Sequence, residues 1–200
     1  KAVPKPDKAV PKPDKAVPKP DKAVPMPDKA VPKPDKGPTC PKVVYSSMFE
    51  TYNGALKSWG DWQWGLYKFA AGKNCDSSKN PPPGAHSGVK MWGTVLNDCH
   101  SGAGNATAAC NNTNPKNNSI LRLELKIPAG CKQAFVEWWE YNDYFLNFDW
   151  AEVRIDGKVI HQNCDSSQVP QKQWVKRVIN ISSYLGKHIG LEFHFLATGV

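Results

Sequence analysis

The chain opens with five near-identical copies of Lys-Ala-Val-Pro-Lys-Pro-Asp over residues 1–35, and only Met26 departs from the pattern. Each copy carries two prolines. Proline fixes φ at about −65° and removes a backbone hydrogen-bond donor, and the residue before each proline is driven toward an extended conformation. Helix and central strand are therefore both excluded. The repeat predicts an extended polyproline-II segment.

The repeat is long enough to act as a stem. At about 3.1 Å per residue, a polyproline-II segment of this length spans on the order of 110 Å. Because the repeat length is not a multiple of the three residues in a polyproline turn, equivalent residues rotate around the axis from copy to copy. No single face then gathers the prolines or the charges. Two interpretations stay open: a spacer between domains of a secreted protein, and an ordered part of an extracellular fibre.

Prolines in a fibre stem of this composition are candidates for hydroxylation and attached sugar. The candidate positions are Pro4, Pro6, Pro11, Pro13, Pro18, Pro20, Pro25, Pro27, Pro32 and Pro34. A sugar-covered stem would satisfy the backbone polar groups that polyproline II leaves unpaired.

Most of the excess positive charge lies in the repeat. Up to Lys36 there are ten lysines against five aspartates (+5), which leaves +3 of the net +8 for the rest of the chain. Nucleic-acid binding requires basic residues clustered with aromatic residues or in a known motif, and every copy of the repeat carries an acid instead. We expect no nucleic-acid partner. No apolar run reaches the roughly 18 residues that a membrane span needs, so we also expect no span.

Six cysteines without a Cys-x-x-Cys pair predict up to three disulfides and an oxidising, secreted location. The candidates are Cys40, Cys75, Cys99, Cys110, Cys131 and Cys164. Their pairing is open, and the short loop between them makes Cys99 with Cys110 the favoured pair. The alternative is a set of buried free thiols in a cytosolic protein. Four Asn-x-Ser/Thr sequons predict N-glycosylation; they begin at Asn105, Asn111, Asn117 and Asn180.

The composition turns aromatic after Lys36, which divides the chain into a repeat stem over residues 1–36 and one domain over residues 37–200. Within the domain, apolar and polar residues alternate with period two, and turn residues separate the runs. The expected strands are 42–49, 62–69, 89–96, 119–127, 133–141, 150–155, 158–162, 172–181 and 189–197. Asp156-Gly157 predicts a two-residue hairpin turn. This pattern favours an all-β fold, an antiparallel β-sandwich of jelly-roll type.

Several short runs carry a resemblance to a known family. They are Phe49-Glu50, Asp61-Trp62-Gln63-Trp64-Gly65, Ala85-His86-Ser87-Gly88 and Trp92-Gly93-Thr94-Val95-Leu96, followed by runs within 121–127, 135–138, 148–153, 179–186 and 189–196. In this order and spacing the chain resembles the MAM-like jelly-roll modules of secreted proteins, including those of immune inhibitor A type metallopeptidases.

The resemblance implies a noncatalytic β-sandwich used in adhesion, carbohydrate contact or assembly. It also implies a structural calcium ion, with Glu50 and Asp149 as the ligands to expect. A further strand normally closes such modules, just beyond the position of Val200. We expect either that the chain is cut before this strand, which we favour, or that another subunit supplies it by β-augmentation.

No pattern predicts catalysis. The five histidines lack the spacing of zinc ligands, and His86 and Ser87 are neighbours that point in opposite directions on a strand. Carboxylates crowd residues 137–152, but sequence alone does not pair them across a sugar as a glycosidase requires. We expect no enzyme activity.

Tryptophan is unusually frequent, with eight residues, all in the domain. Trp138 and Trp139 must point to opposite faces of a strand, so one of them is available for contact. We expect most of the tryptophans to fill the core of the sandwich. A surface aromatic residue near Trp139 or Trp59 is the candidate contact for sugar or protein.

The preferred function is a structural subunit or adhesive component of an extracellular filament. Copies of the chain itself and glycans are its expected partners. The repeat would serve as stem or tether and the sandwich as docking or projecting domain. The alternative is a noncatalytic carbohydrate- or surface-binding module on the stalk of a larger secreted enzyme.

Overall fold

The structure is a computed structural model that describes residues 40–68, 84–97, 115, 117–143, 149–164 and 172–197. All of them belong to the second of the two units into which the chain divides, residues 36–200. The repeat, its ten candidate prolines and the expected boundary near Lys36 lie outside the described residues. No helix in the described part of the chain has the length and apolar character needed to cross a membrane.

The described residues form antiparallel β-sheets joined by turns and one short 3-10 helix, Ser182–Tyr184. The largest sheet has the strand order β1-β4-β9-β6-β7. Its strands are β1 (Lys57–Trp59), β4 (Asn117–Lys126), β9 (His188–Ala197), β6 (Asp149–Ile155) and β7 (Lys158–Asn163). The central strand β9 pairs over its whole length with β4 and over seven residues with β6.

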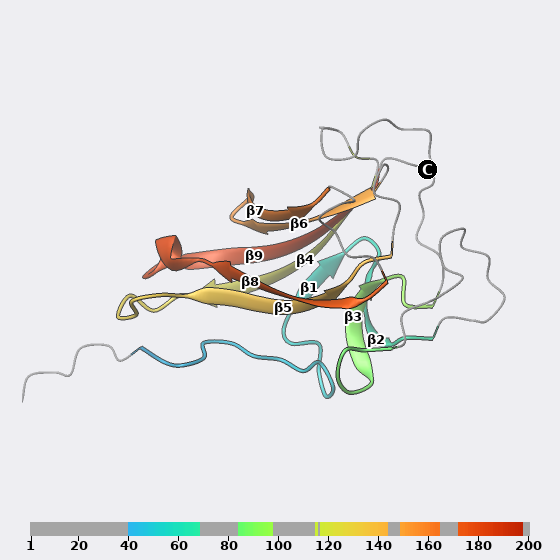
Figure 1. The fold of residues 1–200 in the computed structure, drawn as a ribbon, viewed down its shortest axis with the longest axis horizontal. Coiled ribbons are helices and arrows are strands. Elements are labelled where there is room, and N and C mark those ends of the chain that lie inside the picture. The colour runs from blue at the N-terminus through green and yellow to red at the C-terminus, as the bar shows by residue number, and fades with distance from the viewer. Residues whose placement is uncertain are drawn as a thin grey trace, which may run out of the picture. The chain divides into compact units, whose positions relative to one another are not determined.

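Two further pairs of strands complete the domain (Figure 1). One joins β2 (Trp62–Leu66) to β3 (Lys90–Thr94), and the other joins β5 (Phe135–Tyr141) to β8 (Trp174–Asn180). The β5–β8 pair packs against the five-stranded sheet, as its inward residues Val136, Trp138 and Ile179 contact the main core cluster. The described residues therefore have a β-sandwich-like, all-β arrangement.

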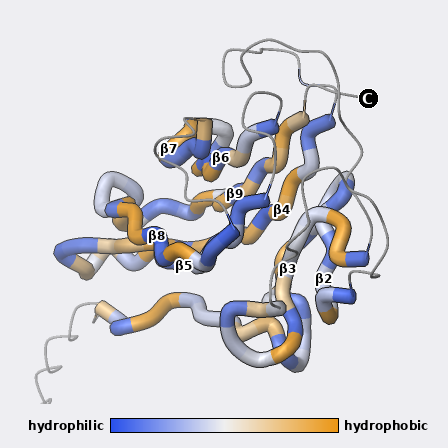
Figure 2. The backbone as a smooth tube through the Cα atoms, turned by 45° about the vertical axis from the view of Figure 1, so that its right-hand side comes forward, coloured by the Kyte–Doolittle hydropathy of each residue, from blue (hydrophilic) through white to orange (hydrophobic). Residues whose placement is uncertain are grey.

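The core follows from the period-two alternation of the strands. In β4, Leu121 and Leu123 are buried while Arg122 and Glu124 face outward. The tube in Figure 2 shows this alternation as hydrophobic and hydrophilic segments along the strands. The main cluster contains Ile127, Val153, Ile155, Ile181, Ile189 and Leu191. Each such side chain contributes about 1.5 to 3 kcal/mol when fully buried.

A second cluster joins β2 and β3 to the large sheet. Leu56, Leu121 and Leu123 are buried there, with Trp62 and Trp92 packed against them. The Trp62 indole N–H donates to the carbonyl oxygen of Ser119 at 3.1 Å. This packing holds the β2–β3 pair against β4.

All but one of the expected strands form, with ends that shift by a few residues. The hairpin turn at Asp156-Gly157 between β6 and β7 is confirmed. The strand expected over 42–49 is wrong: this segment pairs with no strand, and Val43, Val44 and Met48 remain exposed. Packing of Tyr45 against the second cluster holds it instead. The short strand β1 was not expected, since three residues are too few to show a period.

A disulfide between Cys40 and Cys131 joins the start of this irregular segment to the turn before β5. Cys164, at the end of β7, is also disulfide-bonded. The expectation of disulfides is therefore confirmed for the described cysteines. Cys75, Cys99 and Cys110, with the favoured Cys99–Cys110 pair, lie outside the described residues.

Candidate binding surface

The outward face of the β5–β8 pair carries two exposed aromatic residues, Phe135 and Trp139. Successive residues of a strand point to opposite faces, and β5 places Trp138 in the core and Trp139 outside. Trp139 is 45 % exposed. Its register partner on β8 is Lys176, and the next pair on the same face is Tyr141 with Trp174.

Four rings meet at this end of the pair. The imidazole of His86 stacks on the Trp139 indole, with ring centroids 3.8 Å apart and planes inclined by 17°. Trp174 meets His86 edge-on at 5.7 Å, and Tyr141 meets Trp174 edge-on at 5.6 Å. Offset and edge-to-face contacts of this kind stabilise ring positions. We call His86, Trp139, Tyr141 and Trp174 the aromatic patch.

The loop before β3 brings His86 to the aromatic patch. At its end, Gly88 has φ +69°, a left-handed conformation. The Glu50 carboxylate accepts hydrogen bonds from the backbone N–H groups of Val89 at 3.0 Å and Lys90 at 3.1 Å. A Cβ atom on Gly88 would overlap that carboxylate. Glycine at this position and glutamate at position 50 thus fix the loop.

A charged pair lies beside Trp139 on the same face. Lys176 Nζ lies 2.8 Å from Glu137 Oε2, and both side chains remain about half exposed. Hydroxyl-rich ligands bind charged donors and acceptors strongly. The face therefore offers an apolar ring surface next to one cation and one carboxylate.

A buried polar network supports the patch from the inner side of the same strands. Glu140 of β5 accepts hydrogen bonds at Oε1 from Arg177 Nε (2.8 Å), Asn163 Nδ2 (3.1 Å) and Asn142 Nδ2 (3.2 Å). Its Oε2 accepts one from Trp138 Nε1 at 3.0 Å. Burial acts to raise the pKa of Glu140, but the hydrogen bonds from Arg177, Trp138 and Asn142 outweigh it and hold the pKa below its ordinary value. Glu140 is thus an ionised structural acceptor.

One buried histidine, His194, and one half-buried histidine, His161, also have structural surroundings. His194 forms two hydrogen bonds. Its Nδ1 lies 2.9 Å from Asn118 Oδ1, and its Nε2 lies 3.1 Å from Glu192 Oε2. His161 lies edge-on to Trp138 at 5.6 Å. Burial lowers the pKa of both imidazoles. Neither joins a group of three His, Cys, Asp or Glu residues suited to a metal within the described part of the chain.

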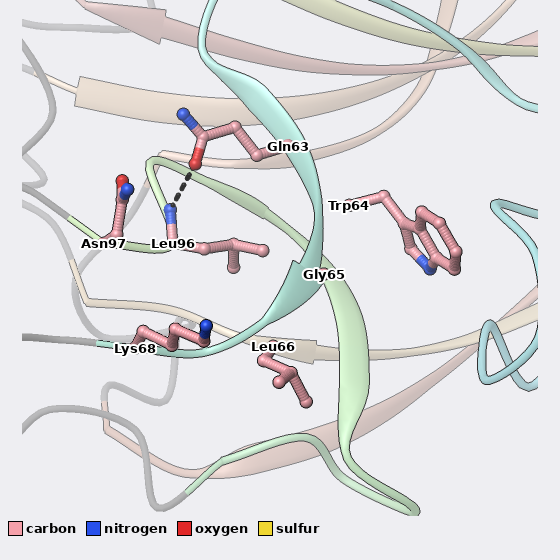
Figure 3. A pocket seen from close by; sticks show the side chains of 7 residues that line it. All are labelled: Gln63, Trp64, Gly65, Leu66, Lys68, Leu96 and Asn97. Atoms are coloured by element: carbon pink, nitrogen blue, oxygen red, sulfur yellow. Dashed lines mark hydrogen bonds between the residues drawn. The ribbon is translucent and has the colours of Figure 1, made fainter.

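A hollow of about 240 Å³ lies apart from the aromatic patch, beside β2 and the residues that follow β3 (Figure 3). Its lining is Gln63, Trp64, Gly65, Leu66, Lys68, Leu96 and Asn97. Gln63 Oε1 accepts a hydrogen bond from the backbone N–H of Leu96 at 3.0 Å. Lys68 is the one charged residue in this lining. Among the described residues that line the hollow, none is a carboxylate or a histidine.

The expected calcium ligands are Glu50, which bonds the loop before β3, and Asp149, at the start of β6. Glu50 uses Oε1 for the two backbone N–H groups of the β3 loop. Asp149 is fully buried at the start of β6, where its register partner is Ala197. Calcium takes about six to eight oxygen ligands. Among the described residues, neither Glu50 nor Asp149 belongs to a group of three or more His, Cys, Asp or Glu residues that could hold a metal ion. The calcium site stays a prediction.

The described sequons differ in surroundings. Asn117 is half-buried at the start of β4 and donates from Nδ2 to Asp61 Oδ2 at 2.6 Å. Asn180 is exposed at the end of β8. Asn105 and Asn111 lie outside the described residues.

Sequence reasoning singled out Trp139 and Trp59 as contact residues, and both are exposed, at 45 % and 52 %. The structure separates them, because Trp59 makes no ring contact with any described residue whereas Trp139 belongs to the aromatic patch. His86 was not expected at this surface. No local pattern carries that contact, since it joins a loop to a strand more than fifty positions away.

No protein-family model, no curated protein and no solved structure matches this chain.

Proposed function

We propose that the chain is a noncatalytic, adhesive component of an extracellular filament, and that its β-domain contacts glycan through the aromatic patch. The observation that carries the proposal is the Trp139 indole, which stacks on His86 and is still 45 % exposed on the outer face of the β5–β8 pair. A rigid exposed aromatic ring loses little conformational freedom on binding. Trp139 is therefore well suited to a ligand with a flat apolar face.

Sugar rings fit this surface chemically. Their C–H faces stack on aromatic rings, and their hydroxyl groups bind charged donors and acceptors. Trp139 supplies the ring, while Glu137 and Lys176 supply polar groups beside it. A sugar seated on the indole could exchange hydrogen bonds with both charged side chains.

The remaining parts of the proposal concern the whole chain. The repeat over 1–36 acts as stem or tether, and the domain is a MAM-like jelly-roll module that docks against copies of the chain or projects from them. The Cys40–Cys131 disulfide supports a secreted location, because disulfides persist in oxidising compartments. A structural calcium ion held by Glu50 and Asp149 stays part of the proposal, and the glycan contact does not depend on it.

The glycan contact is tested by measuring binding of the full chain to a panel of immobilised polysaccharides. Removing a central aromatic contact costs about 2 kcal/mol, so Trp139→Ala should weaken binding at least about tenfold. Trp59→Ala is the matched control, since Trp59 is equally exposed but stands apart from the patch. Equal binding by the Trp139→Ala variant and the parent chain would refute the proposal.

The filament role has its own test. The full chain should assemble in a concentration-dependent way, visible by sedimentation and electron microscopy, and deletion of residues 1–36 should abolish the assembly. A chain that remains monomeric but still binds polysaccharide would favour the alternative, a surface-binding module on the stalk of a larger secreted enzyme.

A further inference from the structure

The opposite end of the β5–β8 face joins a sequon to an exposed aromatic ring. Asn180 of β8 is the register partner of Phe135 of β5. Residues directly opposite in an antiparallel pair project from the same face, with Cβ atoms about 4.5 to 5.5 Å apart. Phe135 is 50 % exposed, and Val178, two residues before Asn180 on the same face, is 49 % exposed. The Asn180 amide therefore stands beside an apolar surface that no described residue covers.

The amide itself is oriented and available. Asn180 Oδ1 accepts a hydrogen bond from the backbone N–H of Ser182 at 2.9 Å. Its Nδ2 donates to no described residue, whereas Asn117 Nδ2 is committed to Asp61. The sequon that begins at Asn117 also has a fully buried hydroxyl residue, Ser119. Of the two described sequons, Asn180 alone combines an exposed side chain with a free amide nitrogen.

We propose that Asn180 carries an N-linked glycan whose first sugar lies over the ring of Phe135. The first sugar of the glycan is attached to Asn180 Nδ2. Because Phe135 lies directly opposite Asn180 in the antiparallel pair, this sugar can reach the Phe135 ring. A sugar placed there covers Phe135 with its apolar C–H face and turns its hydroxyl groups to water. The modification thereby removes exposed apolar surface from the end of the sheet.

The transfer requires a co-substrate and an enzyme of the host. A polyprenyl-diphosphate-linked oligosaccharide is the donor, and a membrane oligosaccharyltransferase catalyses the step. A bond forms between Asn180 Nδ2 and the anomeric carbon, while the bond between that carbon and the diphosphate oxygen breaks. Nδ2 loses one proton, and the polyprenyl diphosphate leaves with the bonding electrons. No oxidation or reduction occurs.

This glycan is distinct from the glycan contact proposed above. Asn180 lies six positions after Trp174 on β8, a distance of about 20 Å along a strand at about 3.3 Å per residue. The attached sugar covers one end of the face and leaves the aromatic patch open at the other. The inference does not rest on the proposed function, and either can fail without the other.

Occupancy is tested on the full chain produced in an N-glycosylating host. Enzymatic release of N-glycans converts the carrier asparagine to aspartate, which peptide mass spectrometry locates. We expect conversion at Asn180 in the parent chain and in the sequon-preserving variant Ser182→Thr. An unmodified Asn180 in the parent chain overturns the inference.

The contact with Phe135 is tested by thermal unfolding of four full-chain proteins: the parent, Phe135→Ser, Asn180→Asp and the double variant. Asn180→Asp removes the glycan but keeps the Oδ1 acceptor for Ser182. We expect Phe135→Ser to lower Tm by about 2 to 4 °C more in the glycosylated background than in the Asn180→Asp background.

The control for this cycle is Leu66→Ser, an exposed apolar residue of β2 on a different sheet. Its effect on Tm should be the same with and without the Asn180→Asp substitution. Equal effects of Phe135→Ser in the two backgrounds overturn the proposed contact.

Discussion

Glu140 and Arg177 are joined across the β5–β8 pair by a hydrogen bond of 2.8 Å between Glu140 Oε1 and Arg177 Nε, on the side that faces the core. Asn163 of β7 bonds the same oxygen. The network therefore ties the strands that carry the aromatic patch to the large sheet. Its integrity governs how firmly the patch is held.

Replacing Glu140 with glutamine should lower the free energy of unfolding by about 3 kcal/mol, because it leaves the Arg177 charge buried without its counter-ion. Urea denaturation of both proteins measures the change. Glu137→Gln is the matched control on the same strand, and the exposed pair with Lys176 should contribute less than about 1 kcal/mol. Equal losses in the two variants would show that the Glu140 network does not stabilise the domain.

Stability should fall as the pH drops below neutrality. Burial lowers the pKa of His161 and His194 in the folded protein. Between these lowered values and the unfolded value of about 6.5, the unfolded chain binds more protons, so acidification favours unfolding. Urea midpoints at pH 7.5 and 5 measure the change.

Substituting either histidine with glutamine should flatten this pH dependence. If the double variant His161→Gln/His194→Gln keeps the same pH dependence of stability, other groups cause that dependence. Glu140 should further reduce the free energy of unfolding at lower pH, because its protonation removes the hydrogen bonds from Arg177, Trp138 and Asn142.

The Cys40–Cys131 disulfide should stabilise the domain strongly. It closes a loop with a sequence separation of 91 residues, for which the chain-entropy relation gives about 4.6 kcal/mol. The Cys40→Ala/Cys131→Ala variant should lose most of this in chemical denaturation under oxidising conditions. A loss below about 1 kcal/mol would mean that Tyr45 and Phe49 hold the irregular segment in place by packing alone.

Alanine substitutions at two glycines with left-handed backbones distinguish the cost of backbone strain from the cost of steric overlap. Gly157 has φ +80° and open space at its Cβ position, whereas Gly88 has φ +69° and faces the Glu50 carboxylate. Alanine at Gly157 should cost about 1 to 2 kcal/mol through backbone strain. Alanine at Gly88 should cost at least about 1 kcal/mol more and should weaken polysaccharide binding by displacing His86. Equal costs at the two positions would contradict the role assigned to Glu50.

Local patterns predicted much of the sheet. In β4, leucines alternate with charged residues, and a strand with one buried face needs no more than this. Asp156 and Gly157 both adopt positive φ in the expected hairpin. The opposite orientations of Trp138 and Trp139 also follow from strand geometry. Segment 42–49 shows the limit of such patterns, since alternation cannot reveal whether a strand finds a partner.

By itself, the sequence predicted most of the strands, the presence of disulfides and the exposure of Trp139 and Trp59, because these depend on neighbouring residues and on composition. Only the tertiary structure decided the pairing of Cys40 with Cys131, the stacking of His86 on Trp139 and the position of Asn180 opposite Phe135. Each of these relationships joins residues more than forty positions apart. The packing of the whole domain sets such contacts, and no local propensity encodes them.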